Sequence, residues 1–530
     1  MEKEMKKYFQ DGSTYVWLTG VMASLSMLLV AGLLMLIFYY GFSTFWQNDV
    51  ATIKLNDGSY ISGEFKKEGK NYDNEDTVQL KIGNRDLYGL DFRWFNKKNI
   101  ESINYNKELL LIERNEWGVF YGFPKELSIE NETIIYETDK DRFYQALEEK
   151  LNFKQAIRKK MEDIEYKISE INYNLRNLNL EKKSSGSIRV KEIEGEILSI
   201  EAKYQILEKE LFQQATKLKK IKLYLYTSDG LEKTLTLDNI ERYINPNSLS
   251  FFEKIGLYFS KIWEFVSDDP RESNTEGGVF PAIFGTVLMV LIMSIVVLPL
   301  GVIAAVYLNE YAKPGKFLNF IRICVNNLAG VPSIVFGVFG LGFFIYGIGG
   351  TLDQLFFTEA LPSPTFGTGG ILWASLTLAL LTVPVVIVAT EEGLNAVPKG
   401  IRDGSLALGS TKWETLKNII IPSATPGILT GLILAIARAT GEVAPLMITG
   451  VVKLAPSMPI DSFFPYVHFE RKFMHLGFHI YDVGFQSPNS EAALPMVFST
   501  TLLLILIVIT LNLTAILLRN KLKKKYKGMI

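Results

Sequence analysis

Two charged residues interrupt a long apolar stretch near the C-terminal end of the chain. Arg438 and Glu442 lie within LILAIARATGEVAPLMITG, residues 432–450, which otherwise has the composition of a membrane-spanning helix. A charge at the centre of a bilayer costs at least ~2.5–3.5 kcal/mol, so such side chains are usually paired or functional. A guanidinium can hold two oxygens of an oxyanion, and a carboxylate accepts a hydrogen bond from a protonated oxygen. The two residues therefore form either a structural ion pair or part of an anion path.

Polar and proline residues in the neighbouring apolar stretches are the next candidates. Ser333 supplies a hydroxyl that can reach an oxygen of a bound anion. An internal proline removes a backbone hydrogen bond and frees a carbonyl that lipid cannot satisfy. Such bends are expected to face protein or a polar cavity, either as packing kinks or as parts of a moving core. Four apolar stretches contain one: Pro299, Pro332, Pro384 and Pro445.

A loop between two apolar stretches, residues 391–422, has the pattern of two short helices. The stretch IRDGSLAL predicts the first helix, Gly409 breaks it, and Thr411–Glu414 has the residues of a capping box that begins the second. Pro422 is expected to end this second helix, and the next span is expected to begin at Pro426. Two helices hinged at a glycine either dock into a groove of another protein or lie on the lipid headgroups.

Six apolar stretches are long enough to cross a bilayer and must position these residues: 15–41, 280–307, 324–346, 369–390, 426–450 and 494–518. The first is interpreted as an anchor because it lacks the small-residue cleavage pattern of a signal peptide. Lys and Arg gather at the N-terminus (Lys3, Lys6, Lys7), after the second and fourth spans, and in the tail up to Lys527, whereas loop 347–368 has neither. Both termini are therefore expected to be cytoplasmic.

This orientation predicts three regions. Residues 1–41 form the cytoplasmic N-terminus and first span, residues 42–270 form an extracytoplasmic domain, and residues 271–530 form the transmembrane domain, so that everything from 42 to 279 is extracytoplasmic. Within the second region, alternating stretches around Asp57-Gly58 predict small β units. Apolar residues at three- and four-residue spacing predict an antiparallel coiled-coil hairpin over 139–221, interpreted as a spacer or packing element rather than a docking arm.

Composition and missing motifs exclude several functions. The 530 residues have a net charge of −1, which favours no nucleic-acid partner, and one cysteine, Cys324, which rules out an intrachain disulfide. His475 and His479 have the spacing of a helical metal pair and His468 lies nearby, but no third ligand is obvious, so no metal is expected. No nucleophile–base pair and no phosphate-binding loop is found. The chain is therefore expected to be no enzyme and to need no cofactor, and any ATP-driven motor must be a separate chain.

The loop at 391–422 resembles the EAA loop of ABC-importer permeases, with Asp403-Gly404-Ser405 in place of the family triplet, then Gly409, and an ending Ile419-Ile420-Ile421-Pro422. The stretches NLAGVPSIVFGVFGLG (327–342), LTVPVVIVATEEGLNAVPKG (381–400) and ARATGEVAPLMITG (437–450) are similar to phosphate-import permeases of the PstA type. MHLGFHIYDVGFQSPN (474–489) and the insert after the first span resemble the long subgroup of that family.

The resemblance implies an α-helical integral membrane protein with six transmembrane helices of the ABC importer permease type. It implies import of phosphate by alternating access, together with an ABC ATPase dimer, a PstC-type permease and an extracytoplasmic phosphate-binding protein, in contact with membrane lipid. It points to Arg438 and Glu442 as transport residues and to the loop as the ATPase-coupling surface, made of Asp403, Gly404, Ser405, Leu408, Gly409 and Pro422. The alternatives are a permease for sulfate or molybdate, or a membrane-anchored scaffold or sensor.

Overall fold

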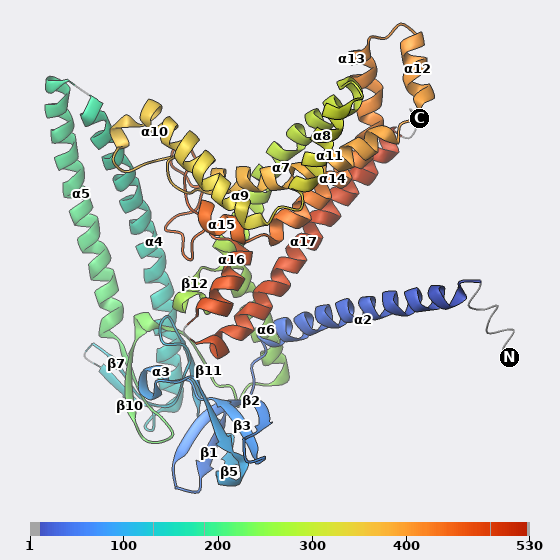
Figure 1. Cartoon of the computed structure of the whole chain (residues 1–530). Helices are drawn as coiled ribbons and strands as arrows, with labels where there is room; N and C mark the ends of the chain where they lie inside the picture. Colours follow the sequence, from blue (N-terminus) through green and yellow to red (C-terminus); the bar gives the residue numbers. More distant parts are fainter. Residues whose placement is uncertain (1–10, 131, 185, 488, 527–530) are drawn as a thin grey trace, which may run out of the picture.

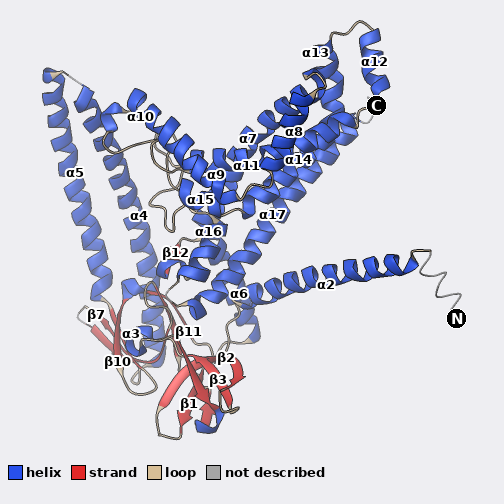
Figure 2. Cartoon of the chain, in the orientation of Figure 1, coloured by secondary structure: helices blue, strands red, loops and turns tan. Residues whose placement is uncertain are grey.

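The chain folds into a helical membrane domain with a β-rich insert (Figures 1 and 2), and this confirms the predicted fold class. The computed structural model describes residues 11–526 apart from residues 131, 185 and 488. The basic residues Lys3, Lys6, Lys7 and Lys527, on which part of the orientation argument rests, lie outside the described residues.

Six helices among the described residues are long and apolar enough to cross a membrane. Several of them consist of consecutive segments joined without a break, because π-helical turns (η4, η5 and η7) continue the α-helices. The spans are α2 (Ser13–Ser43), α7–η4 (Phe280–Val306 and Tyr307–Tyr311), α9–η5–α10 (Ser333–Phe339, Gly340–Gly349 and Gly350–Phe356), α11 (Ile371–Asn395), α13–η7–α14 (Lys412–Thr415, Leu416–Ile420 and Ile421–Gly441) and α17 (Ser490–Tyr526).

Helix α11 lies at the centre of the membrane domain and packs against α7 and α14 through small residues. A Cβ atom on Gly301 of α7 would lie 2.5 Å from Val386 Cγ1 on α11, and one on Gly427 of α14 would lie 2.6 Å from the Cα atom of Gly393. Such small residues let helix backbones approach closely where the hydrophobic effect gives no drive for association. Helix α2 is exposed along most of its length and touches α17 near its C-terminal end, where Tyr40 stacks on Phe498 at 5.0 Å.

Prolines divide the spans differently from the prediction. Pro299 and Pro384 lie inside α7 and α11, as expected. Pro332 and Pro445 are not internal kinks: Pro332 is the extended N-cap of α9, and Pro445 lies in the first turn of the short helix α15 (Ala444–Thr449). A proline cannot donate to the carbonyl four residues earlier and disfavours helical geometry in the residue before it. The third span therefore begins at Ser333, and the preceding residues form the separate helix α8 (Lys316–Leu328).

Pro422 does not end the second loop helix, and that prediction is wrong. The helix that begins at Lys412 continues through η7 into α14, with Pro422 in the first turn of α14 and Pro426 inside it. The π-helical turn directly before Pro422 changes the hydrogen-bond register, so that the chain passes the proline without a break. One helical segment therefore runs from Lys412 to Gly441.

The insert contains two antiparallel sheets, drawn at the end of the molecule opposite α12 (Lys399–Ala407) and α13 in Figure 1. The first has the order β4-β3-β2-β1-β5 (Phe92–Asn96, Asp76–Lys81, Tyr60–Lys70, Ala51–Leu55 and Ile100–Asn104). The second has the order β10-β9-β7-β6-β11 (Glu232–Thr236, Lys222–Tyr226, Phe120–Ile129, Leu110–Arg114 and Ile240–Ile244), with β8 (Glu132–Ile135) paired to β7. The shorter elements are α3 (Arg85–Tyr88), β12 (Pro270–Arg271), β13 (Glu276–Gly277), α16 (Leu476–Tyr481) and η8 (Asp482–Gln486).

Two long helices, α4 (Lys140–Ser184) and α5 (Ser187–Lys220), form a hairpin that rises from the second sheet (Figure 1). Phe143, Leu147 and Ile157 of α4 and Leu218 of α5 are buried in the core of that sheet. The hairpin is thus rooted in the β core, and α4 runs from there toward the loops that join the membrane helices.

The amphipathic helix α6 (Phe251–Ser267) connects the insert to the second span and begins at a capping box formed by Ser250 and Glu253. Arg242 of β11 contacts Glu113 of β6 at 2.5 Å and Glu264 of α6 at 2.8 Å, and Lys261 of α6 reaches Glu113 at 2.9 Å. These charges fix α6, and hence the start of α7, to the second sheet.

This network predicts a pH-dependent contribution to stability. Burial alone would raise the pKa of Glu113, but the charges of Lys261 and Arg242 outweigh burial and lower it to about 2. The contribution is therefore fully present above the ordinary carboxyl pKa and is lost as the pH falls toward 2. Glu113→Gln should lower the unfolding free energy by about 3 kcal/mol at pH 7, and by clearly less at pH 3. Thermal unfolding of the full chain at both pH values measures this. The exposed-pair control Glu101→Gln should change little, and an equal loss for Glu113→Gln at both pH values would contradict the argument.

Candidate functional site

The two charged residues of the fifth span contact each other where its helix ends. Arg438 Nε lies 3.5 Å from Glu442 Oε1, and the side chains are 31% and 23% exposed. In the described part of the chain Arg438 makes no other ion pair, so both terminal nitrogens of its guanidinium remain unengaged. A long contact through one nitrogen leaves the planar fork free for a bidentate partner.

The break in the helix differs from the expected continuous span over 426–450. Helix α14 ends at Gly441, and Glu442 is extended at φ −79° and ψ 132°. Glycine has a low helix propensity, and Pro445 cannot donate a hydrogen bond to the carbonyl of Gly441. The series of helical backbone hydrogen bonds therefore ends at this point. Arg438 therefore lies in the last turn of α14, where the helix dipole favours a positive charge, rather than in the middle of a span.

Ser333 is linked to the charged pair by the packing of its helix, α9, and not by a hydrogen bond. Helix α15 follows the break and packs against α9, where a Cβ atom on Gly337 would lie 2.7 Å from the Cα atom of Pro445. Ser333 is one turn before Gly337 on α9, and no hydrogen bond joins it to Arg438 or Glu442 in the described structure. The structure thus brings Arg438 and Glu442 into contact. It places α9, the helix that carries Ser333, beside α15, the helix that follows the two charges.

The loop at 391–422 forms a second candidate surface. Gly409 adopts φ +88°, a conformation that favours glycine, and turns the chain from α12 into α13. The capping box of Thr411 and Glu414 is present as predicted. The hydroxyls of Ser405 and Thr415 are both buried and lie 2.9 Å apart, which joins the two helices.

The outer side of this α12–α13 hairpin is exposed. Leu408 is 89% exposed, Asp403 and Gly404 are exposed, and Trp413 is 59% exposed. Exposed large apolar side chains at a hinged tip are typical of a surface that docks against another protein. Two residues assigned to this surface from the sequence lie elsewhere. Ser405 is buried against Thr415, and Pro422 lies in the first turn of α14.

The α12–α13 hairpin is held in place by residues that carry no recognisable pattern in the sequence. Arg402 Nη1 contacts Glu310 Oε1 of η4 at 2.6 Å, and its other terminal nitrogen donates to the carbonyl of Leu394. Lys412 lies over the ring of Tyr311, 4.7 Å from its centroid, and donates to the carbonyl of Glu310. The hairpin is therefore tied to the end of the second span. No local sequence pattern could have identified these contacts, because Glu310 and Arg402 are far apart in the chain.

Two of the three histidines have polar partners, whereas both ring nitrogens of His479 are buried without a hydrogen-bond partner among the described residues. His468 Nε2 lies 3.0 Å from Asp461 Oδ1, and His475 Nδ1 accepts from the backbone N–H of Gly477 at the start of α16. Burial lowers the pKa of His475 to about 3 and is also the main cause that lowers the pKa of His479 to about 4, so both rings are neutral at pH 7. Within the described residues, no three His, Cys, Asp or Glu side chains gather as a metal site.

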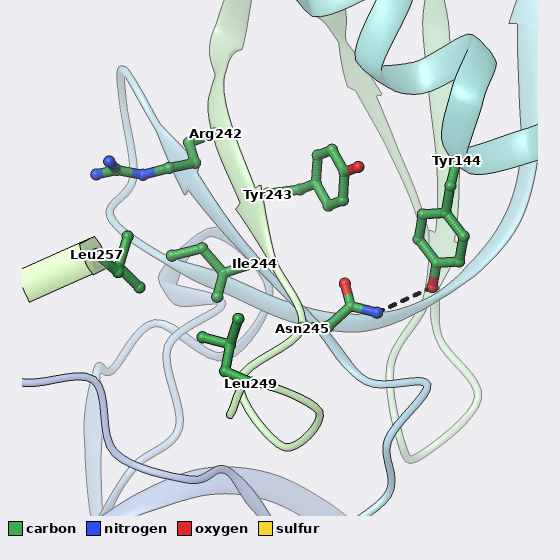
Figure 3. Close-up of a pocket in the computed structure, with 7 residues that line it drawn as sticks. All are labelled: Tyr144, Arg242, Tyr243, Ile244, Asn245, Leu249 and Leu257. Carbon is green, nitrogen blue, oxygen red and sulfur yellow. Dashed lines mark hydrogen bonds between the residues drawn. The ribbon is translucent and has the colours of Figure 1, made fainter. Parts of the chain in front are cut away.

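A cavity of about 400 Å³ at the junction of β11, α4 and α6 offers no site for a charged ligand (Figure 3). Of the residues that line it, Arg242 is charged and already contacts Glu113 and Glu264. Asn245 donates to the Tyr144 hydroxyl at 3.1 Å, and most other lining side chains are apolar. This cavity is a packing gap beneath the hairpin.

A buried carboxylate orders the loop between the third and fourth spans. Asp353 is 1% exposed and accepts hydrogen bonds from the backbone N–H groups of Thr365, Phe366 and Gly367 at 3.0, 2.8 and 2.7 Å. The indole of Trp373 donates to the carbonyl of Phe366 at 2.7 Å. Asp353 of α10, which shows no signal in the sequence, therefore holds the loop together with Trp373 of α11.

Comparison with known proteins matches the membrane domain. The family described as "binding-protein-dependent transport system inner membrane component" matches residues 297–528. A probable ABC transporter permease, YqgI of Bacillus subtilis, is 31% identical over 270 residues, which cover 50% of this chain and 85% of the relative. Phosphate transport system permease protein PstA 1 of Mycobacterium tuberculosis is 36% identical over 244 residues, 46% of this chain and 71% of the relative.

Solved structures of ABC importers are more distant. The inward-facing MetNI methionine ABC transporter is 17% identical over 50% of this chain and 98% of its own chain, with a TM-score of 0.33. A bacterial ABC transporter involved in alginate import is 10% identical over 50% of this chain and 83% of its own, with a TM-score of 0.34.

The role of Asp353 is testable. Asp353→Ala should destabilise the full chain by about 3 kcal/mol, because three buried backbone donors lose a charged acceptor. Limited proteolysis in detergent should then cut the loop over 357–370 faster than in the wild type, with thermal unfolding as the second measurement. The control Glu359→Ala removes a partly exposed carboxylate of the same loop and should leave both unchanged. A wild-type cleavage rate in Asp353→Ala would show that other contacts order the loop.

Proposed function

Because this chain belongs to the family of binding-protein-dependent transport system inner membrane components, we propose that it is the permease subunit of an ATP-driven importer whose substrate is inorganic phosphate. Relatives named as phosphate transport permeases, 35–36% identical, support this substrate. The observation that carries the proposal is the Arg438–Glu442 contact at the break after α14, since an unengaged guanidinium fork in an apolar span is suited to an oxyanion.

The two side chains have complementary roles in this proposal. The free nitrogens of Arg438 take two phosphate oxygens in parallel, and the long contact to Glu442 opens at little cost. Glu442 accepts a hydrogen bond from the protonated phosphate oxygen and holds Arg438 when the site is empty. Sulfate and molybdate, the alternative substrates, lack that proton at neutral pH, so the carboxylate of Glu442 would repel them. The contact thus favours phosphate among oxyanions.

Coupling to ATP hydrolysis is assigned to the α12–α13 hairpin and to a separate ABC ATPase dimer. The helical segment from Lys412 to Gly441 has the hairpin at one end and Arg438 at the other. At about 1.5 Å per residue it spans roughly 45 Å. A tilt imposed on the exposed tip is therefore transmitted by one continuous helix to the substrate contact, and through Glu310 to the end of the second span.

The remaining partners follow from the same assignment. A PstC-type permease forms the other half of the pathway, and an extracytoplasmic phosphate-binding protein delivers the substrate. The α12–α13 hairpin is cytoplasmic together with both termini, and residues 42–279 are extracytoplasmic, since Lys and Arg gather at that end of the spans. The alternative of a membrane-anchored scaffold or sensor does not account for a hinged surface at one end of a charged span.

Loss of either charge should abolish transport. Arg438→Gln and Glu442→Gln are expected to reduce phosphate uptake by reconstituted complex at least about tenfold, since each removes a charge-assisted contact in a poorly solvated site. Arg438→Lys should rescue poorly, because a point charge replaces a planar fork. Copurification of the partner chains serves as the control for assembly. Near-normal uptake by Arg438→Gln would show that its charge has no part in transport.

The turn at Gly409 gives a test of coupling. Gly409→Pro cannot adopt φ +88° and should abolish uptake while the chain still reaches the membrane, with ATPase activity lost or no longer stimulated by substrate. Gly409→Asn is the matched control, because asparagine tolerates this conformation and should retain most uptake. If Gly409→Pro supports normal uptake, the α12–α13 hairpin is not the coupling element.

A further inference from the structure

A polar cavity of about 690 Å³ lies between the helical hairpin and two loops of the membrane domain. One wall is α4, and the other consists of residues from the loop after α10 and from the loop between α15 and α16. This cavity is built from two regions of the chain that are unrelated in sequence, the insert and the permease domain.

Aromatic stacking clamps α4 to the second of these loops. Tyr166 and Tyr173, two turns apart on α4, both stack on Phe463 with ring centroids 5.6 and 5.5 Å away. The Tyr173 hydroxyl donates to the carbonyl of Phe464 at 2.6 Å, and the Tyr166 hydroxyl lies 2.9 Å from Ser462 Oγ. The hairpin is therefore packed against the permease domain and forms a fixed wall of the cavity.

Three cationic side chains line the cavity, and two of them lack an acidic partner. Arg176 of α4 makes no hydrogen bond or ion pair with any described residue, and Lys183 donates only to the carbonyls of Glu359 and Leu361. Arg471 contacts Asp461 at 2.5 Å. One lining carboxylate, Glu470, lies 3.3 Å from His468 Nδ1. The positive charge of the α4 wall is thus uncompensated.

Hydroxyl groups complete the lining. Ser363, Thr365, Thr368 and Ser457 all face this cavity, and their side chains form no hydrogen bond with the described residues. A guanidinium, an ammonium and several free hydroxyls around a polar volume are the donor set that binds a polyatomic oxyanion.

The cavity adjoins the chain segment that follows Arg438 and Glu442. The backbone N–H of Gly370 donates to the carbonyl of Thr449 at the end of α15 at 3.1 Å, and that of Ile371 donates to the carbonyl of Arg471 at 2.9 Å. Helix α15 starts two residues after Glu442. The loops that line the cavity are therefore hydrogen-bonded to each other and to the end of α15. Helix α15 is the segment that connects the cavity to Glu442 and Arg438.

We propose that this cavity is an oxyanion-binding site at the extracytoplasmic end of the permease, and that the helical hairpin supplies its basic wall through Arg176 and Lys183. The choice of phosphate as its ligand rests on the proposed function. The site holds the anion before it reaches Arg438 and so lowers the substrate concentration needed for transport. The insert then has a role in substrate capture.

Direct binding tests the site in the purified complex without the binding protein. Isothermal titration with inorganic phosphate is carried out in an Arg438→Gln background, which removes the inner contact. Saturable binding should persist there and weaken about tenfold or more when Arg176→Gln or Lys183→Gln is added. Lys167→Gln, an exposed α4 lysine outside the lining, is the matched control and should have no effect. Binding that is absent in the background, or unaffected by Arg176→Gln and Lys183→Gln, would overturn the inference.

Transport separates this inference from the proposed function. With Arg438 intact, Arg176→Gln and Lys183→Gln should raise the KM for phosphate about tenfold and leave kcat nearly unchanged. If the wild type transports phosphate and both variants keep its KM, the cavity site is wrong while the proposed function stands. If the wild type transports no phosphate, the proposed function fails, and the cavity is then tested by titration with sulfate or molybdate. Binding of either anion that is lost in Arg176→Gln supports an oxyanion site in the cavity. Absence of binding by the protein with an intact cavity refutes it.

Discussion

A charge within an apolar span must be compensated, and this constraint shapes the membrane domain around Arg438. The guanidinium lies in the last turn of α14, where unpaired carbonyls and the helix dipole favour a cation, and Glu442 stands just beyond the helix end. A discontinuous helix is tolerated in a bilayer only where protein or a polar cavity meets its free backbone groups. The close approach of α9 to α15 at Gly337 supplies protein on one side of the break. The break in the helix, the charge of Arg438 and the packing of α9 on α15 thus depend on one another.

The helix that precedes the break is continuous, and it connects the α12–α13 hairpin mechanically to the charged pair. Had the helix ended at Pro422, the α12–α13 hairpin and the charged pair would belong to separate bodies joined by a turn. Instead, the segment from Lys412 to Gly441 is uninterrupted, and the hairpin at its N-terminal end is fixed to the second span by Arg402 and Lys412. A helix of this length transmits a rigid-body tilt without further intermediates, as the proposed coupling to ATP hydrolysis requires.

Sequence patterns predicted what depends on local chemistry. The six spans, the β units, the helical hairpin, the capping box at Thr411 and the turn at Gly409 follow from hydropathy, alternation and residue conformational preference. The prolines were predicted less well, because the effect of Pro332, Pro422 or Pro445 depends on whether the preceding turn is α-helical, π-helical or already broken.

Contacts between distant segments were beyond local patterns. The Arg402–Glu310 pair, the three hydrogen bonds to Asp353 and the clamp of Tyr166 and Tyr173 on Phe463 join residues whose proximity only the tertiary fold creates. For the same reason, the sequence favoured a spacer or packing element for the hairpin and gave no sign that it lines a cavity. In the candidate site, the sequence singled out Arg438 and Glu442 by their cost in lipid, and the structure brings them into contact, but the position of Arg438 at a helix end was not predicted.

The central claim is that Arg438 binds the anion rather than only stabilising the fold. Uptake by a charge-swapped complex, Arg438→Glu combined with Glu442→Arg, measured beside each single change, tests it most directly. The swap preserves an ion pair at this position. We therefore predict that the double variant assembles and loses no more than about 1 kcal/mol of stability, because a carboxylate then meets the C-terminal dipole of α14, yet transports phosphate no better than the single variants. Restoration of uptake to near the wild-type rate by the swap would show that the pair is structural and would contradict the account.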